Sequence, residues 1–253
     1  MDFMNTATCQ NLARSFAGES QARQRYTQYA AQARKEGFEY LARIFEETAA
    51  NEQAHAQEFL EKLQKYGHQP IENIDISAGY PFTLGVTMEN LLEAAKGENE
   101  ESVRVYPAFA KTAREEGYPD AAALWENISR IEAVHRDVFL ESYDQMQTER
   151  LYKKDHPVVW RCLNCGFVML SKEAFRVCPV CGKDRGWAEG DVQTSASGKT
   201  LRRSALCSVC PRSRRARRRK SSTSRCTPRE CAPAPRSASA QEPALRSMEG
   251  LAG

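Results

Sequence analysis

The 253-residue sequence contains no run approaching the roughly 20 apolar residues that span a bilayer. Its first ten residues, MDFMNTATCQ, lack the cationic region and apolar stretch of a secretory signal. Aromatic residues are absent after Trp187, so the last part of the chain has little with which to build a core. We therefore expect a cytoplasmic protein with no membrane partner.

Positive charge is outnumbered by negative charge in most of the chain. Residues 190–253 contain 14 Lys and Arg against 4 Asp and Glu, whereas residues 1–189 contain 22 against 29. Such an acidic body argues against a nucleic-acid partner, because binding phosphate backbones requires clustered Lys and Arg. Residues 191–253, rich in Ser, Arg, Pro and Ala, are predicted to be a disordered basic tail. Its four cysteines and the run SRRARRRK leave two alternatives open, a further zinc site or a nucleic-acid-binding arm.

An internal repeat organises the first 147 residues. Shifting the sequence by 80 positions aligns residues 33–55 with 113–135 without a gap. Apolar residues in both copies recur in steps of three and four, and a shared glycine marks a helix end. Each copy therefore predicts a helical hairpin. We predict an all-α fold in which residues 1–147 form an antiparallel four-helix bundle, with residues 67–86 as the crossover.

Carboxylates and histidines lie on the core-facing stripes of these helices. Glu52 and His55 are three apart on one helix, and Glu132 and His135 occupy the equivalent positions of the repeat. Burying ionised carboxylates without a partner is costly, so the cluster requires a cation. The other two helices add three glutamates on their own stripes, Glu19, Glu98 and Glu101. One Glu from each of two helices with Glu-x-x-His from the other two is the ligand set of di-iron and di-manganese bundles.

The alternative is a set of hydrogen-bonded polar residues in an ordinary core. Two of only four histidines carry the Glu-x-x-His pattern, at matching positions of the repeat, and this coincidence favours the metal site. Tyr26 and Tyr106 follow Glu19 and Glu98 by seven and eight residues, which places their hydroxyls near the metals. Core packing alone would also explain two tyrosines there.

A second metal motif follows a charged linker at residues 148–157. Residues 158–190 contain two Cys-x-x-Cys pairs, formed by Cys162, Cys165, Cys178 and Cys181. Four thiolates at this spacing hold one tetrahedral ion, and iron and zinc both accept such a site. In a reducing cytoplasm disulfides are disfavoured. Because a redox site in the bundle needs an electron donor and zinc has no redox chemistry, we predict one iron in this module.

The sequence resembles the rubrerythrins over residues 1 to about 187. The stretches that carry the resemblance are AGESQAR at 17–23, GENEE at 97–101, YPAFA at 106–110, AREEGY at 113–118, the two Glu-x-x-His motifs, WRCLNCG and CPVCG. The resemblance implies a ferritin-like bundle with two non-haem irons, followed by a rubredoxin-like module with one iron on four cysteines. Members of the family end with a short closing strand, which the sequence WAEGDVQTSASGKT is expected to lack.

The resemblance also implies a role for each ligand. Glu52 and Glu132 would bridge the irons, with Glu19 and His55 on one iron and Glu98 and His135 on the other. Glu101 would be a seventh ligand that His55 replaces on reduction. The resemblance further implies an extra residue in the third helix, which is expected as a π-bulge. The repeat agrees with this, because it is offset by 79 residues at AGE (17–19) and by 80 elsewhere.

The activity that this resemblance implies is reduction of hydrogen peroxide to water in defence against oxidative stress. Glu101, Tyr26 and Tyr106 are the candidate catalytic residues, with the tyrosines as proton donors. The expected partners are an external NAD(P)H-dependent reductase or rubredoxin as electron donor, and a second copy of the chain in a homodimer. Two other functions compete, a ferroxidase of the ferritin kind and, more distantly, a zinc-ribbon adaptor for nucleic acid.

Overall fold

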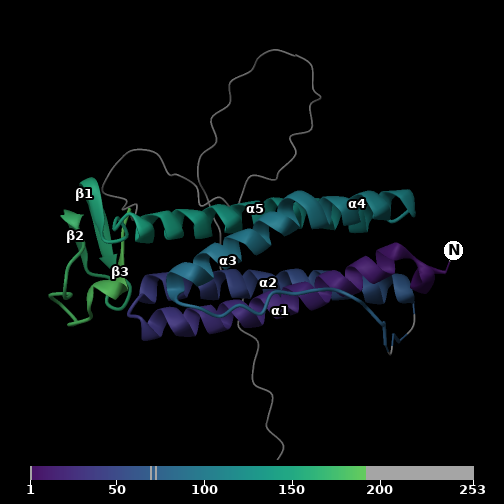
Figure 1. The fold of residues 1–253 in the computed structure, drawn as a ribbon, viewed down its shortest axis with the longest axis horizontal. Helices are drawn as coiled ribbons and strands as arrows, with labels where there is room; N and C mark the ends of the chain where they lie inside the picture. The colour runs from purple at the N-terminus through teal and green to yellow at the C-terminus, as the bar shows by residue number, and fades with distance from the viewer. Residues whose placement is uncertain (1, 69, 72, 192–253) are drawn as a thin grey trace, which may run out of the picture. The chain divides into compact units, whose positions relative to one another are not determined.

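The computed structural model describes residues 2–68, 70–71 and 73–191, and within them the fold is an antiparallel four-helix bundle followed by a small sheet (Figure 1). The bundle is built from α1 (Ala7–Lys35), α2 (Glu39–Gly67), a third helix in three parts, and α5 (Pro119–Gln147). A 3-10 turn, η1 (Phe3–Asn5), precedes α1. The predicted all-α bundle is confirmed.

The third helix is interrupted by a π-helical turn. Its parts are α3 (Thr87–Glu100), η2 (Glu101–Val105) and α4 (Tyr106–Glu115), which follow one another without a break in the chain. A π turn accommodates one extra residue in a helix. The expectation of a bulge in this helix, implied by the resemblance and in agreement with the change of repeat offset, is therefore confirmed.

Each helical hairpin closes through a glycine in the left-handed region. Gly37 has φ 81° between α1 and α2, and Gly117 has φ 88° between α4 and α5. Both glycines follow a helix end, where a residue with a side chain would be strained. The two hairpins are joined by the segment between Gly67 and Thr87, which runs along α1 (Figure 1). Tyr80 fastens this segment by donating its hydroxyl hydrogen to the carbonyl of Arg14 at 3.0 Å.

Two apolar clusters fill the bundle on either side of its polar middle. One contains Tyr29, Phe45 and Phe139, and the other contains Phe59 and Trp125, all fully buried. Burial of one such aromatic side chain contributes about 1.5–3 kcal/mol. These clusters fix the helices against one another, so the polar side chains between them are held on a rigid frame.

The cysteine-bearing module is a three-stranded antiparallel sheet in the order β2-β1-β3. Its strands are β1 (Lys153–Cys162), β2 (Val168–Glu173) and β3 (Ala188–Glu189), with a 3-10 turn, η3 (Arg185–Trp187), before the last. Trp160 is buried at the centre and donates from its indole nitrogen to the carbonyl of Ser171 at 3.0 Å.

Two details differ from the sequence expectation for this module. β1 begins at Lys153, inside the segment expected to be a linker, because Lys153 pairs with Glu173 across a register shift. The closing strand expected to be missing is present as β3, although it has two residues. It pairs Ala188 with Cys162, so a small buried side chain lies opposite a cysteine of the metal motif.

The predicted tail lies almost wholly outside the described residues, since only Asp191 of residues 191–253 belongs to them. This also applies to the cysteines and the basic run of the tail. Among the helices that the structure describes, none has the length and apolar character required to cross a membrane.

Candidate metal centres

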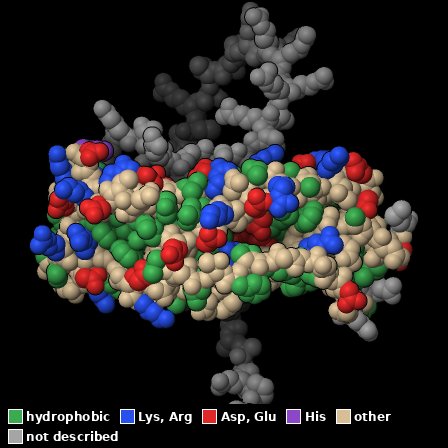
Figure 2. Space-filling view, in the orientation of Figure 1, with side chains coloured by type: hydrophobic (Ala, Val, Ile, Leu, Met, Phe, Trp, Pro, Cys, Tyr) green, Lys and Arg blue, Asp and Glu red, His purple; other side chains and the backbone are tan. Residues whose placement is uncertain are grey.

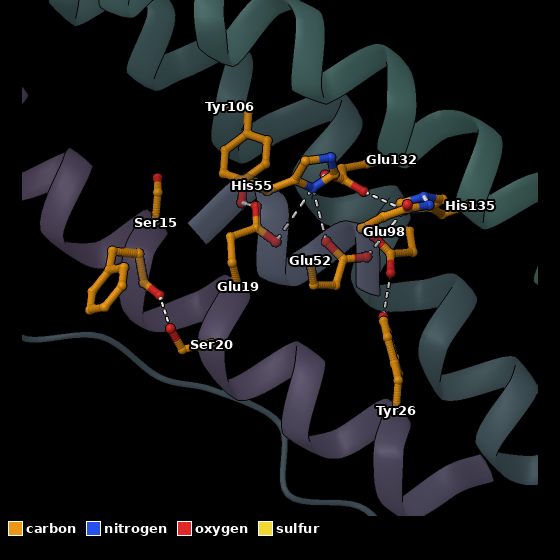
Figure 3. A network of polar contacts seen from close by, with 12 residues as sticks. Ser15, Glu19, Ser20, Tyr26, Glu52, His55, Glu98, Tyr106, Glu132 and His135 are labelled. Atoms are coloured by element: carbon orange, nitrogen blue, oxygen red, sulfur yellow. Dashed lines mark hydrogen bonds and ion pairs between the residues drawn. The ribbon is translucent and has the colours of Figure 1, made fainter. Parts of the chain in front are cut away.

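All four helices of the bundle direct acidic or imidazole side chains into its middle (Figure 3). The carboxylates come one from each helix and are no more than 1% exposed, and the two imidazoles are 5–6% exposed: Glu19, Glu52, Glu98, Glu132, His55 and His135. The helical period explains this, because residues three or four apart lie on one face of a helix. The pairs Glu52 with His55 and Glu132 with His135 therefore point the same way from α2 and α5.

These six side chains form two groups that share two carboxylates. One group contains Glu19, Glu52, His55 and Glu132, and the other contains Glu52, Glu98, Glu132 and His135. Within each group the candidate ligand atoms lie within 4.8 Å of one another. The shared members are Glu52 and Glu132, the residues for which the sequence resemblance implies a bridging role.

The histidines face the shared carboxylates through Nδ1. His55 Nδ1 lies 3.0 Å from both Glu52 and Glu132 and 3.8 Å from Glu19. His135 Nδ1 lies 2.7 Å from Glu132 and 3.2 Å from Glu52. The rings are stacked with their centres 5.9 Å apart. Nδ1 is thus the ring atom that each histidine offers to a metal.

Burial and crowding dominate the electrostatics. Burial raises the pKa of Glu19 to about 8, and the charge of Glu52 adds to this shift. Burial also raises the pKa of Glu98 well above its ordinary range. Burial alone would lower the pKa of His135, but the carboxylates of Glu132 and Glu52 raise it to about 9. Without a cation, therefore, the site holds its protons tightly.

The donor set fits two dications. One carboxylate oxygen of each glutamate is buried and makes no hydrogen bond among the described residues: Oε2 of Glu19, Oε1 of Glu52, Oε2 of Glu98 and Oε1 of Glu132. Those of Glu52 and Glu132 lie 3.2 and 3.0 Å from a histidine Nδ1, which cannot serve all four carboxylates. Buried carboxylate oxygens are costly without a positive charge, so the cluster favours cations. Carboxylates combined with imidazoles suit iron, manganese or zinc.

Each of the two candidate tyrosines donates a hydrogen bond to a glutamate of the other hairpin. Tyr26 of α1 donates its hydroxyl hydrogen to Glu98 of α3, and Tyr106 of α4 donates to Glu19 of α1 (Figure 3). Burial raises the pKa of both phenols well above the ordinary value, so both remain protonated donors. The structure thus brings both hydroxyls to the site, each on the glutamate of the opposite hairpin.

Asn51 is a neighbour of the site that the sequence reading missed. Its side-chain amide lies 3.2 Å from Nε2 of His135, on the far side of the ring from the carboxylates. Such contacts fix the orientation of ligating histidines. The repeat offers a signal, because Ile131, at the position equivalent to Asn51, has no side-chain amide. The two histidines are therefore held differently.

Glu101, the first residue of η2, belongs to neither of the two groups. Its carboxylate is nevertheless close to them, because burial and the charges of Glu19, Glu132 and Glu52 raise its pKa well above the ordinary range. Together with Tyr106, Glu101 lines a cavity of about 380 Å³ between α1, the crossover segment and α3. The arrangement therefore has His55 facing the shared carboxylates and Glu101 facing the cavity.

The four predicted cysteines converge in the small module. Cys162 Sγ lies 3.6 Å from Cys181 Sγ, and Cys165 Sγ lies 3.6 Å from Cys178 Sγ. A sulfur tetrahedron with bonds of about 2.3 Å has edges of about 3.8 Å, so this spacing fits one ion. The backbone N–H of Lys183 and the side chain of Asn164 lower the pKa of Cys181 to about 6, which favours the thiolate.

Comparison with known proteins matches both parts of the chain. The model of the rubrerythrin family covers residues 10–143 and 89–160, and the model described as "Rubrerythrin, rubredoxin-like domain" covers residues 160–186. The chain belongs to the rubrerythrin family. It is 43% identical to Rubrerythrin-1 of Clostridium acetobutylicum over 176 residues, which make up 70% of this chain and 90% of that protein. It is 36% identical to a rubrerythrin of Nitratidesulfovibrio vulgaris over 183 residues, 72% of this chain and 93% of the relative.

A solved structure agrees with the family assignment. The structure titled "Partially Reduced State of Nigerythrin" covers 74% of this chain and 90% of its own, with a TM-score of 0.50 and 27% identity. The fold is thus the ferritin-like bundle of rubrerythrins with its C-terminal rubredoxin-like region. The cofactors of the family are a di-iron site with carboxylate and histidine ligands and one iron on four cysteines, and both donor sets are present here.

Proposed function

We propose that this rubrerythrin is a non-haem di-iron peroxidase that reduces hydrogen peroxide to water in oxidative stress defence. The observation that carries the proposal is the pair of ligand groups sharing Glu52 and Glu132, in one chain with a four-cysteine site. Two adjacent metals suit a two-electron reaction at one O–O bond, and a third metal outside the bundle suits electron supply.

Hydrogen peroxide takes up two electrons and two protons and yields two water molecules. Two ferrous ions, when bound, supply one electron each. The protein holds this pair through the shared carboxylates, with Glu19 and His55 serving one position and Glu98 and His135 the other. Glu101 is proposed as the seventh ligand, in exchange with His55.

The tyrosines orient two of the glutamates and supply protons. Because burial keeps both phenols protonated, Tyr26 and Tyr106 can hold Glu98 and Glu19 in position. The same hydroxyls are the buried O–H donors best placed to pass a proton toward a departing oxygen. The surrounding apolar clusters exclude bulk water from the reaction.

Electrons are proposed to reach the bundle through the iron on Cys162, Cys165, Cys178 and Cys181. A reductase or rubredoxin outside this chain supplies them. We also propose that the protein works as a homodimer, in which the rubredoxin-like iron of one subunit serves the di-iron site of the other. This arrangement rests on the family resemblance.

One observation favours a ferroxidase as the second candidate. The two ligand groups contain six residues without Glu101, and six ligands suffice for iron oxidation by dioxygen. The four-cysteine site favours the peroxidase, because iron storage needs no electron input.

Single-turnover kinetics separate the two functions. The protein is loaded anaerobically with Fe(II), then mixed with equal concentrations of hydrogen peroxide or dioxygen, and its visible absorption is followed. We expect the peroxide reaction to be at least about tenfold faster, since the site is matched to its substrate. Glu52→Gln should lose the reaction, and Glu58→Gln, an exposed glutamate on α2, should retain it. A faster reaction with dioxygen would favour the ferroxidase.

A further inference from the structure

Several charged side chains line the cavity beside Glu101. It has a volume of about 380 Å³ and lies between α1, residues 78–81 of the crossover and the third helix. Acidic side chains lie recessed between the helices on the face shown in Figure 2, with basic side chains around them. Four cations line it, namely Arg14, Arg25, Lys96 and Arg104.

Three of these cations already have partners. Arg14 donates to the carbonyl of Ser77 and to the side chain of Asn11. Lys96 pairs with Glu93 and Arg104 pairs with Glu100, each at 2.5 Å. These three side chains are thus accounted for by local surface contacts.

Arg25 is different. Its Nε and Nη1 are buried and have no hydrogen-bond partner among the described residues. Its guanidinium carbon lies 5.0 Å from the ring centre of Tyr26, the tyrosine that holds Glu98. Tyr29 also lies against this guanidinium, with its ring centre 5.9 Å from the guanidinium carbon. A guanidinium is always charged, and its Nε and Nη1 still need an acceptor.

The position of Arg25 points to that acceptor. A Cβ on Gly97 would lie 3.8 Å from Nη2 and 3.9 Å from Nη1 of Arg25, so the guanidinium rests on the third helix at this glycine. Glu101 follows Gly97 by four residues and lines the same cavity. Residues four apart are neighbours on one helix face. Within the described part of the chain, no hydrogen bond reaches the carboxylate of Glu101, whereas its backbone N–H and carbonyl bond within the helix.

We propose that Arg25 is a positioning residue that receives the carboxylate of Glu101 whenever this carboxylate is away from the metals. A rotation of the two side chains within the cavity would form a charge-assisted hydrogen bond to Nε and Nη1. Both unpaired groups would then be satisfied at once. The inference rests on the proposed function, in which Glu101 exchanges with His55.

The pairing has a thermodynamic consequence. It stabilises only the arrangement in which Glu101 is released, which is the reduced state under the proposed function. A protein group that binds one of two states shifts their equilibrium toward that state. Loss of Arg25 should therefore disfavour the reduced di-iron site, and this effect should require Glu101.

The test is a double-mutant cycle on the iron-loaded, full-length protein. Arg25→Gln, Glu101→Gln and the double variant are titrated anaerobically with dithionite against redox mediators, and the ratio of reduced to oxidised di-iron site is read at fixed potential. We expect Arg25→Gln to lower this ratio by about fivefold or more, and by less than about twofold in the Glu101→Gln background. Arg25→Lys, which keeps the charge, should restore part of the loss. Arg104→Gln removes a paired cation from the same cavity and should leave the ratio within about twofold of wild type.

Three results would overturn the proposal. An equal change in both backgrounds would mean that Arg25 acts as a distant charge or on peroxide directly. An unchanged ratio in Arg25→Gln would mean that it plays no part in the exchange. If Glu101→Gln itself changes nothing while peroxide oxidation remains fast, Glu101 is no ligand, and this inference fails while the peroxidase stands. Should Arg25→Gln fail to load iron, Arg25→Lys is measured in both backgrounds by the same criterion.

Discussion

Glu116, at the end of α4, accepts hydrogen bonds from the backbone N–H of Thr8 at 2.8 Å and from its hydroxyl at 2.6 Å. Thr8 lies in the first turn of α1, where backbone donors have no partner within the helix. Glu36, the equivalent residue of the repeat, accepts from the backbone N–H of Thr87 at the start of α3, at 3.1 Å. The carboxylate that follows one helix thus caps another, and the two hairpins are tied together.

Removal of this cap should destabilise the fold. Glu116→Ala leaves the N–H groups of Ala7 and Thr8 without their acceptor. We expect a loss of about 1 kcal/mol in the free energy of unfolding, the usual effect of losing a helix cap. Urea denaturation followed by circular dichroism measures it. Glu115→Ala, at the exposed neighbouring position, should cost less than half as much, and equal losses would show that the cap is unimportant.

The same cap should contribute to acid sensitivity. Burial raises the pKa of Glu116, but the hydrogen bonds from Thr8 and Ala7 outweigh it and hold the pKa below the ordinary value of 4.5. A carboxylate with a depressed pKa in the folded state stabilises the fold above its unfolded pKa, and this contribution is lost as pH falls through the folded value. The stability difference between wild type and Glu116→Gln should therefore be full at pH 6 and vanish in strong acid. A difference independent of pH would contradict this account.

More of the metal site than of its surroundings could be predicted from the sequence. Glu52 with His55 and Glu132 with His135 could be predicted because helical spacing and the repeat put them on equivalent core faces. The crosswise pairing of Tyr26 with Glu98 could not, since it depends on how two hairpins pack. Arg25 reads as an ordinary surface arginine of α1, because neither its burial nor its unpaired nitrogens leave a trace in the residue pattern.

In the small module, too, local features could be predicted from the sequence and a long-range contact could not. The spacing of its cysteines predicts a tetrahedral site, because two Cys-x-x-Cys turns need only local geometry. Strand β3 was missed because two residues, Ala188 and Glu189, give no alternating pattern. Its register comes from pairing with β1, a contact between segments about 27 residues apart.

Electron delivery to the bundle should require the four-cysteine site. Cys178→Ser removes one buried thiolate from the sulfur tetrahedron and should leave the ligands of the bundle intact. We expect about two irons per chain in place of about three, and loss of reductase-coupled peroxide turnover. Iron analysis and a steady-state assay measure both. Val180→Ala, an exposed substitution between Cys178 and Cys181, should retain iron and turnover, and undiminished turnover in Cys178→Ser would exclude the module as donor.

The two tyrosine hydroxyls should contribute to metal affinity. Tyr26→Phe and Tyr106→Phe each remove a buried hydrogen bond to a glutamate of the site. Groups that orient metal ligands typically affect affinity by about 10-fold or more, so each variant should bind Fe(II) correspondingly more weakly. Anaerobic Fe(II) titration gives the constants. Tyr29→Phe is the matched control, because its buried hydroxyl donates to the carbonyl of Thr83 at 2.7 Å and touches no ligand.

Glu101 decides whether the seven-residue set or the six-residue set governs the reaction. The structure places Glu19, Glu52, His55, Glu98, Glu132 and His135 in the two groups without it. Glu101→Ala should therefore still bind two ferrous ions. If Glu101 is the ligand that His55 replaces on reduction, its loss destabilises the oxidised site and slows peroxide reduction by about tenfold or more, as expected for a tuned metal ligand. The measurements are anaerobic Fe(II) stoichiometry and single-turnover oxidation by peroxide and by dioxygen. Glu100→Ala removes the adjacent exposed carboxylate and should leave both rates within about twofold of wild type. Equal rates in wild type and Glu101→Ala, together with a preference for dioxygen, would make the ferroxidase the better account of this chain.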